Sequence, residues 1–123
     1  MIRRLLTKPC PEVVLHIGMN KTGTTALQSY LLSVSSELAK HGIVYPRTGL
    51  MGAAHYGVSA SLGFCNAGAP SEWKAPLKKL RQGLESEINS HTQQVILSSE
   101  DFLLNKPFEP LKDFLQGYPV KVI

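Results

Sequence analysis

The first strand-like segment of the chain is apolar along almost its whole length. Residues 12–17 read Glu-Val-Val-Leu-His-Ile and are rich in β-branched side chains. A strand with one face in water alternates apolar and polar residues, whereas a strand of a parallel sheet is covered on both faces and reads as a continuous apolar run. The segment therefore predicts a central strand of a parallel sheet.

Further strands and helices are expected to alternate behind this strand. One helix is expected from about Thr24 to Lys40, with Gly42 as its stop, and another is expected to open at Ser71 as its N-cap. Such alternation with short links predicts an α/β fold with a parallel sheet and right-handed crossovers. The other expected elements are strands at 43–45, 94–98 and 120–123 and helices around 55–62 and 108–115. The expected apolar stripes are Leu27, Leu31, Val34 and Leu38 in the first long helix and Trp73, Leu77, Leu80, Leu84 and Ile88 in the second.

Size and charge restrict the classes of function. With 123 residues the chain makes one domain, which we expect to consist of an arm at 1–11 and an α/β core at 12–123. The formal net charge of +4 suits a small anionic ligand but is too low for the basic stripe of a nucleic-acid binder. No apolar run can span a bilayer and no targeting segment precedes the core, so we expect a cytoplasmic protein.

The two cysteines give little sign of a metal site. Cys10 and Cys65 lie far apart and form no CxxC pair. Two free thiols in a reducing compartment is the simpler interpretation, and a disulfide stays open as the alternative.

The last residues of the chain resemble the beginning of a buried strand. Residues 118–123 read Tyr-Pro-Val-Lys-Val-Ile, and the chain stops there. A sheet edge without its covering layer exposes apolar surface. We therefore expect the α/β core to be truncated at its C-terminal end.

A glycine-bracketed loop joins the first strand to the first helix. Residues 16–25 read His-Ile-Gly-Met-Asn-Lys-Thr-Gly-Thr-Thr. Glycines let backbone N–H groups converge on an anion, and a helix N-terminus adds unpaired donors, so this arrangement predicts a phosphate site. Gly18 and Gly23 have the separation of a P-loop, but the lysine precedes the second glycine, so the motif is not a Walker A sequence.

At this point the chain resembles a known family. Lys21 to Thr25, followed by Ala26-Leu27-Gln28, is similar to the 5′-phosphosulfate loop of sulfotransferases that use 3′-phosphoadenosine 5′-phosphosulfate (PAPS). Asn20 replaces the usual proline, as in bacterial-type members. Tyr45-Pro46-Arg47 and Leu97-Ser98-Ser99-Glu100 also resemble segments of this family, so the likeness runs from about Glu12 to the end. It implies a three-layer sandwich of the P-loop type.

The resemblance implies in-line transfer of a sulfuryl group from PAPS to a hydroxyl or amine, without a metal. Lys21 would stabilise the charge on the leaving oxygen. The donor site would be completed by Asn20, Thr22, Gly23, Thr24, Thr25 and Ser98. The arginine and serine that bind the 3′-phosphate in this family would follow the strand at 120–123, beyond the chain end. The acceptor is expected to be a carbohydrate, with lipids and small alcohols as alternatives.

Two residues are candidates for the general base. Glu100 follows the polar end of the third strand, where ligands of open α/β folds bind. The alternative is that Glu100 is only the first residue of a helix, where the helix dipole favours an acidic side chain. His55 is expected in a loop facing the acceptor, or it is a packing residue. His16, inside the first strand, is interpreted as structural. Ser98 and Ser99 either bond a ligand or cap the following helix.

The sequence is also compatible with two other functions. One is a non-catalytic remnant that binds phosphosulfate without turnover. The other is a P-loop kinase or nucleoside triphosphatase, against which the order of the loop residues and the lack of a clear Walker B aspartate both count.

Overall fold

Four parallel strands form the centre of the molecule. The computed structural model describes residues 10–17, 24–64, 71–103 and 108–123. The strands are β1 (Glu12–His16), β2 (Ile43–Val44), β3 (Gln94–Ser98) and β4 (Val120–Val122), in the order β2-β3-β1-β4. Every pairing is parallel, which confirms the predicted α/β fold with a parallel sheet.

The two central strands, β1 and β3, place side chains on both faces of the sheet. β1 and β3 pair with Val14 opposite Ile96 and His16 opposite Ser98. Because side chains alternate between faces, Val13 and Leu15 share one face with the corresponding residues of β3. That face carries the hydrophobic core, which joins the strands to three helices through Val13, Leu15, Val58, Leu62, Phe64, Leu80, Leu84, Val95, Leu97, Phe102, Leu111, Phe114 and Leu115.

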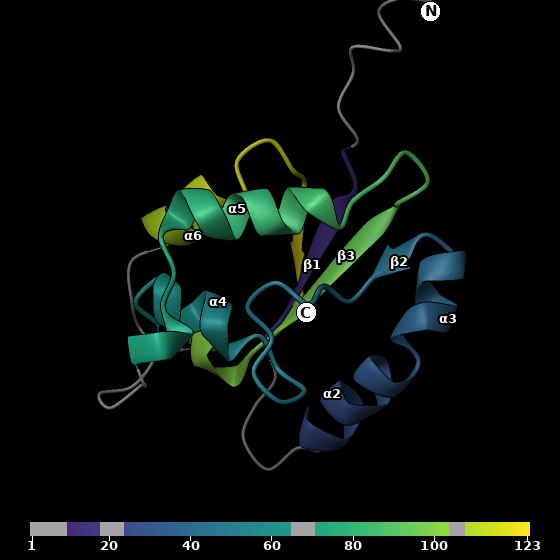
Figure 1. The fold of residues 1–123 in the computed structure, drawn as a ribbon, viewed down its shortest axis with the longest axis horizontal. Coiled ribbons are helices and arrows are strands. Elements are labelled where there is room, and N and C mark those ends of the chain that lie inside the picture. Colours follow the sequence, from purple (N-terminus) through teal and green to yellow (C-terminus); the bar gives the residue numbers. More distant parts are fainter. Residues whose placement is uncertain (1–9, 18–23, 65–70, 104–107) are drawn as a thin grey trace, which may run out of the picture.

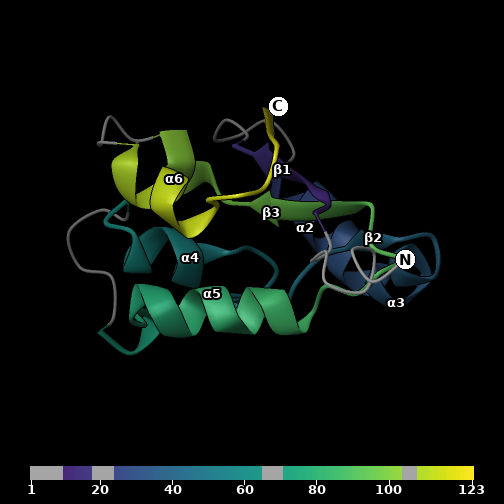
Figure 2. The same ribbon diagram turned by 90° about the horizontal axis from the view of Figure 1, so that it is seen from above.

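The helices lie on both sides of the sheet (Figures 1 and 2). On the core side are α4 (Tyr56–Ser61), α5 (Leu77–Ser86) and α6 (Glu109–Phe114). On the other side are α2 (Thr24–Ser33) and α3 (Ser35–Lys40), helices being numbered from α2 as in Figure 1. Two 3₁₀ turns, η1 (Ser71–Trp73) and η2 (Glu100–Leu103), complete the described elements.

The long helix predicted from Thr24 to Lys40 is two helices. The break is at Val34, whose φ of −106° and ψ of 14° are not helical. Serines flank it, and the Ser33 hydroxyl bonds to the Tyr30 carbonyl, competing with the regular helical ladder. The predicted stop is confirmed, because Gly42 follows α3 with a φ of 77°.

The apolar stripe expected on this first helix is not its buried face. Leu27 is 42% exposed, whereas Gln28 beside it is 2% exposed. Among the described side chains of α2, the fully buried one is thus an amide. This side of the sheet is held by a polar contact, described below.

The predicted helix from Ser71 is likewise divided. Ser71–Trp73 is a 3₁₀ turn, and α5 starts only at Leu77, with Pro76 in the N-cap position. A residue before proline avoids the helical region, so Ala75 cannot continue a helix into Pro76. The proline therefore sets the start of α5, and Ser71 is not its cap.

The strand predicted at 120–123 is present, but it is not buried. β4 pairs with β1 along one side only and lies at the end of the sheet. Val120 and Val122 are 46% and 55% exposed. An apolar groove of about 380 Å³ runs beside them along α6.

Candidate functional site

The candidate site lies at the carboxyl ends of β1 and β3. β1 is followed by a connection that reaches β2 beyond β3, whereas β3 is followed by one that reaches β4 beyond β1. The two connections thus leave in opposite directions from neighbouring strands. In open α/β sheets ligands bind outside the carboxyl ends of the strands at such a switch point.

The residues of the predicted phosphate site fall, in the sequence, between the end of β1 and the first turn of α2. Of its predicted donor-binding residues, Asn20, Lys21, Thr22 and Gly23 lie outside the described residues, as does the side chain of Thr24. What the structure describes are its two ends, His16 at the end of β1 and Thr24 at the start of the ten-residue α2. Thr25 is exposed in the first turn of that helix. A helix N-terminus carries unpaired N–H groups and a positive dipole end, both suited to an anion.

Ser98 is the centre of a polar cluster at this edge. Its side chain is fully buried, and its Oγ lies 2.8 Å from His16 Nδ1. Gln28 Nε2 of α2 donates to the same oxygen at 2.9 Å. The Tyr45 phenol donates to the Ala53 carbonyl at 2.5 Å, and burial raises the pKa of Tyr45 to about 12. Ser98 Oγ thus joins the end of β1 to α2 through two side-chain contacts.

His55 is held by backbone groups at both ring nitrogens. The Ser98 N–H donates to His55 Nδ1 at 3.0 Å, so Nδ1 is unprotonated and Nε2 carries the hydrogen that is donated to the Pro46 carbonyl at 2.8 Å. The ring is 0% exposed, and burial lowers its pKa to about 4. With no free lone pair and no exposure, this imidazole has the contacts of a structural residue.

The start of α4 is aligned residue by residue with the end of β3. His55 N–H donates to the Ser98 carbonyl at 2.7 Å, and Ser59 Oγ lies 3.1 Å from Ser99 Oγ. Ser99 Oγ also accepts from the Asp101 N–H at 3.2 Å, which confirms a capping role for this serine. These contacts fix the chain immediately before Glu100.

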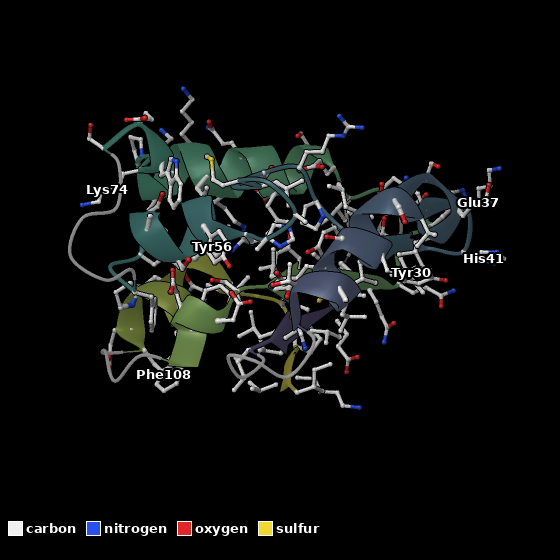
Figure 3. The ribbon with its side chains drawn as sticks, turned by 90° about the horizontal axis from the view of Figure 1, so that it is seen from below. Tyr30, Glu37, His41, Tyr56, Lys74 and Phe108 are labelled. Atoms are coloured by element: carbon white, nitrogen blue, oxygen red, sulfur yellow. The ribbon has the colours of Figure 1, made fainter. Side chains whose placement is uncertain are left out.

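Glu100 accepts a hydrogen bond from a neighbouring aromatic residue. Tyr56 Oη donates to Glu100 Oε2 at 2.6 Å. The Tyr56 ring stacks on Trp73 of η1, with ring centroids 6.1 Å apart and an interplanar angle of 12°. Figure 3 shows Tyr56 on the α4 side of the carboxyl edge, with Lys74 and Phe108, whereas Tyr30, Glu37 and His41 lie on the α2–α3 side.

The structure therefore brings Ser98, Glu100 and His55 to the same edge of the sheet, where each has different hydrogen-bond partners. It also adds Gln28, Tyr45 and Tyr56, which sequence reasoning did not select. Gln28 had no signal as a buried residue, because it lies outside the apolar stripe that the sequence predicts as the inner face of the helix. Tyr56 had none either, because its partner Glu100 is 44 residues away in the sequence.

Other classes of site find no support in the described part of the chain. No group of three or more His, Cys, Asp or Glu side chains in residues 10–17, 24–64, 71–103 and 108–123 could hold a metal ion. Within the same ranges, none of the helices has the length and apolar character needed to cross a membrane. Cys10 is exposed and its thiol donates to the Gly117 carbonyl, while Cys65 lies outside the described residues. No family model, curated protein or solved structure matches this chain.

Proposed function

We propose that this chain carries the donor-site core of a PAPS-dependent sulfotransferase, which transfers a sulfuryl group to a hydroxyl or amine acceptor. The observation that carries the proposal is the meeting of three segments at Ser98. These are the segments that resemble sulfotransferases, and they are far apart in the sequence. Gln28 of the first donates to Ser98 Oγ, and Pro46 of the second is linked to the Ser98 N–H through His55.

The strand order supports the same proposal. Lys21, Thr22 and Gly23 fall in the sequence between β1 and α2, and Thr24 and Thr25 open α2. The carboxyl end of β1 lies at the switch point of the sheet. A three-layer sandwich of the P-loop type, with a phosphate loop after its first strand, accounts for this placement. The acceptor class we propose is a carbohydrate.

The chemistry required of the residues is mainly neutralisation of charge. PAPS supplies the sulfuryl group, whose bond to the oxygen of the 5′-phosphate breaks as a bond to the acceptor oxygen or nitrogen forms. Lys21 neutralises the charge that grows on the leaving oxygen, and Thr24 and Thr25 hold the phosphate. The acceptor proton passes to Glu100. Glu100 is chosen over His55 because both nitrogens of His55 already bind backbone groups.

Calorimetry and a transfer assay test the proposal. The full chain is titrated with PAP, PAPS and Mg-ATP, and transfer of labelled sulfate from PAPS is measured with carbohydrate acceptors. We expect PAP and PAPS to bind without magnesium and label to reach the acceptor. Binding without transfer would favour a phosphosulfate-binding protein, and magnesium-dependent binding of ATP would favour a P-loop kinase or triphosphatase.

A single substitution tests the role of the loop lysine. Lys21→Ala should lower the transfer rate by about 10²–10³-fold, the usual cost of removing one preorganised charge partner. Lys40→Ala is the matched control, because Lys40 is exposed and pairs with Glu37 on α3. Normal turnover in Lys21→Ala would refute the assigned role.

A further inference from the structure

The carboxyl group of Glu100, just after the carboxyl end of β3, is hydrogen-bonded to Tyr56, whose ring stacks on Trp73. We propose that Tyr56 is a positioning residue for Glu100, holding Oε2 so that Oε1 faces the acceptor and takes its proton. The inference rests on the proposed function, and it adds a residue that nothing in the resemblance assigns.

The contact between the two side chains is short and directional. Tyr56 Oη donates to Glu100 Oε2 at 2.6 Å, which is a typical length for a hydroxyl bound to a carboxylate. The phenol is the donor and the Glu100 carboxyl oxygen is the acceptor. Among the described residues, Oε1 has no hydrogen-bond partner. One oxygen is thus engaged and the other is left to act as the base.

The phenol can position a carboxylate only if it is itself fixed. The Tyr56 ring stacks on Trp73, with the two ring planes within 12° of each other. Its backbone opens α4, where His55 N–H binds the Ser98 carbonyl and Ser59 Oγ meets Ser99 Oγ. Tyr56 is therefore held at its ring by Trp73 of η1, and its helix is held by contacts with Ser98 and Ser99, directly before Glu100.

The hydrogen bond on Oε2 orients the carboxyl group of Glu100. The donor restricts rotation of that group, and a base must lie within hydrogen-bond reach of the proton that it removes. Such positioning should raise kcat and leave the binding of PAPS unchanged.

The test compares Tyr56→Phe with the wild-type full chain in the transfer assay. Phenylalanine keeps the stack on Trp73 and removes only the hydroxyl. We expect kcat to fall about tenfold, with the KM for PAPS unchanged. Tyr30→Phe is the matched control, because Tyr30 is 62% exposed on α2, and it should retain wild-type kcat.

A double-mutant cycle separates positioning from a general structural effect. If Tyr56 acts through Glu100, Tyr56→Phe should cost nothing further in a Glu100→Gln background. Equal losses in both backgrounds would overturn the proposal, as would wild-type kcat in Tyr56→Phe.

Two further outcomes are distinguishable. If the wild-type chain transfers no sulfuryl group, both the proposed function and this inference fail. If the wild-type chain does transfer it and Tyr56→Phe has the same kcat, only the positioning role fails.

If Tyr56→Phe does not fold, Trp73→Leu replaces it in the test. This variant keeps the hydroxyl but removes the ring support, so kcat should fall at constant KM, and an unchanged kcat would overturn the proposal.

Discussion

At the scale of single residues, the burial of His55 links the candidate site to pH. The imidazole is neutral in the folded protein, with its pKa lowered to about 4 by burial, against 6.5 in an unfolded chain. The unfolded state therefore binds more protons between these values, so stability is complete above pH 6.5 and falls as the pH drops towards 4. A shift of this size corresponds to about 3 kcal/mol of unfolding free energy.

His55→Gln isolates this contribution. The amide retains one acceptor for the Ser98 N–H and one donor for the Pro46 carbonyl but does not titrate. Urea unfolding between pH 7 and 4.5 should show a smaller loss of stability in His55→Gln than in the wild type. His41→Gln removes an exposed histidine and should behave as the wild type. Equal pH slopes in all three proteins would contradict the explanation.

The sequence selected His55, Ser98 and Glu100 but could not distinguish their roles. A histidine near a strand end has the same appearance whether its nitrogens face a ligand or the backbone. The distinction depends on Pro46 and Ser98, which lie 9 and 43 residues away from His55. Only the folded contacts decide it.

At the scale of elements, α2 is attached to the sheet by a polar contact. Gln28 is its fully buried described side chain, and the amide of Gln28 donates to Ser98 Oγ. Elements with few buried apolar contacts open at low free energy. Gln28→Leu should therefore speed amide hydrogen exchange in α2 about tenfold, the effect of losing one net hydrogen bond of about 1.4 kcal/mol.

Exchange in α5 and β3 supplies the internal reference for that experiment. Both elements belong to the hydrophobic core and should keep their protection in Gln28→Leu. Gln82→Leu, at an exposed position of α5, is the matched control. Faster exchange throughout the molecule would show that Gln28 supports the whole fold, and unchanged exchange in α2 would show that the contact contributes nothing.

Element types were predictable and two element boundaries were not. The strand at 94–98 and the helix around 55–62 follow from local composition, and both are present. An apolar period predicts one helix through Val34, but the backbone of Val34 is not helical, and the hydroxyl of the neighbouring Ser33 bonds to the Tyr30 carbonyl. Pro76 was visible in the sequence, and its effect on Ala75 outweighs the cap signal at Ser71.

At the scale of the whole molecule, the sheet follows from the apolar run of β1, whereas the strand order does not. A run buried on both faces indicates a central position, and β1 does lie between β3 and β4. The sequence carries no comparable signal for which strands are its neighbours. For the same reason β4 was predicted to be buried from its composition, although it occupies the edge of the sheet.

That edge makes a prediction about self-association. In the part of the chain that the structure describes, no strand pairs with the outer side of β4, and Val120, Val122 and Ile123 are 46%, 55% and 58% exposed. An apolar edge of this kind is a template for pairing with another chain, and natural sheets block such edges with lysine. Val122→Lys should therefore lower the association seen by light scattering as protein concentration is raised. The side chain at 122 is exposed, so the substitution should leave the unfolding midpoint near that of the wild type.

The control must separate the position of the new charge from its sign. Leu77→Lys adds the same charge at a residue of α5 that is 38% exposed and does not line the groove beside β4. If the edge drives association, Val122→Lys suppresses it and Leu77→Lys does not. If both variants suppress it equally, the higher net charge is responsible, because like charges repel wherever they lie on the surface. If Val122→Lys still associates and Leu77→Lys does not, the associating surface lies on α5 and not on β4.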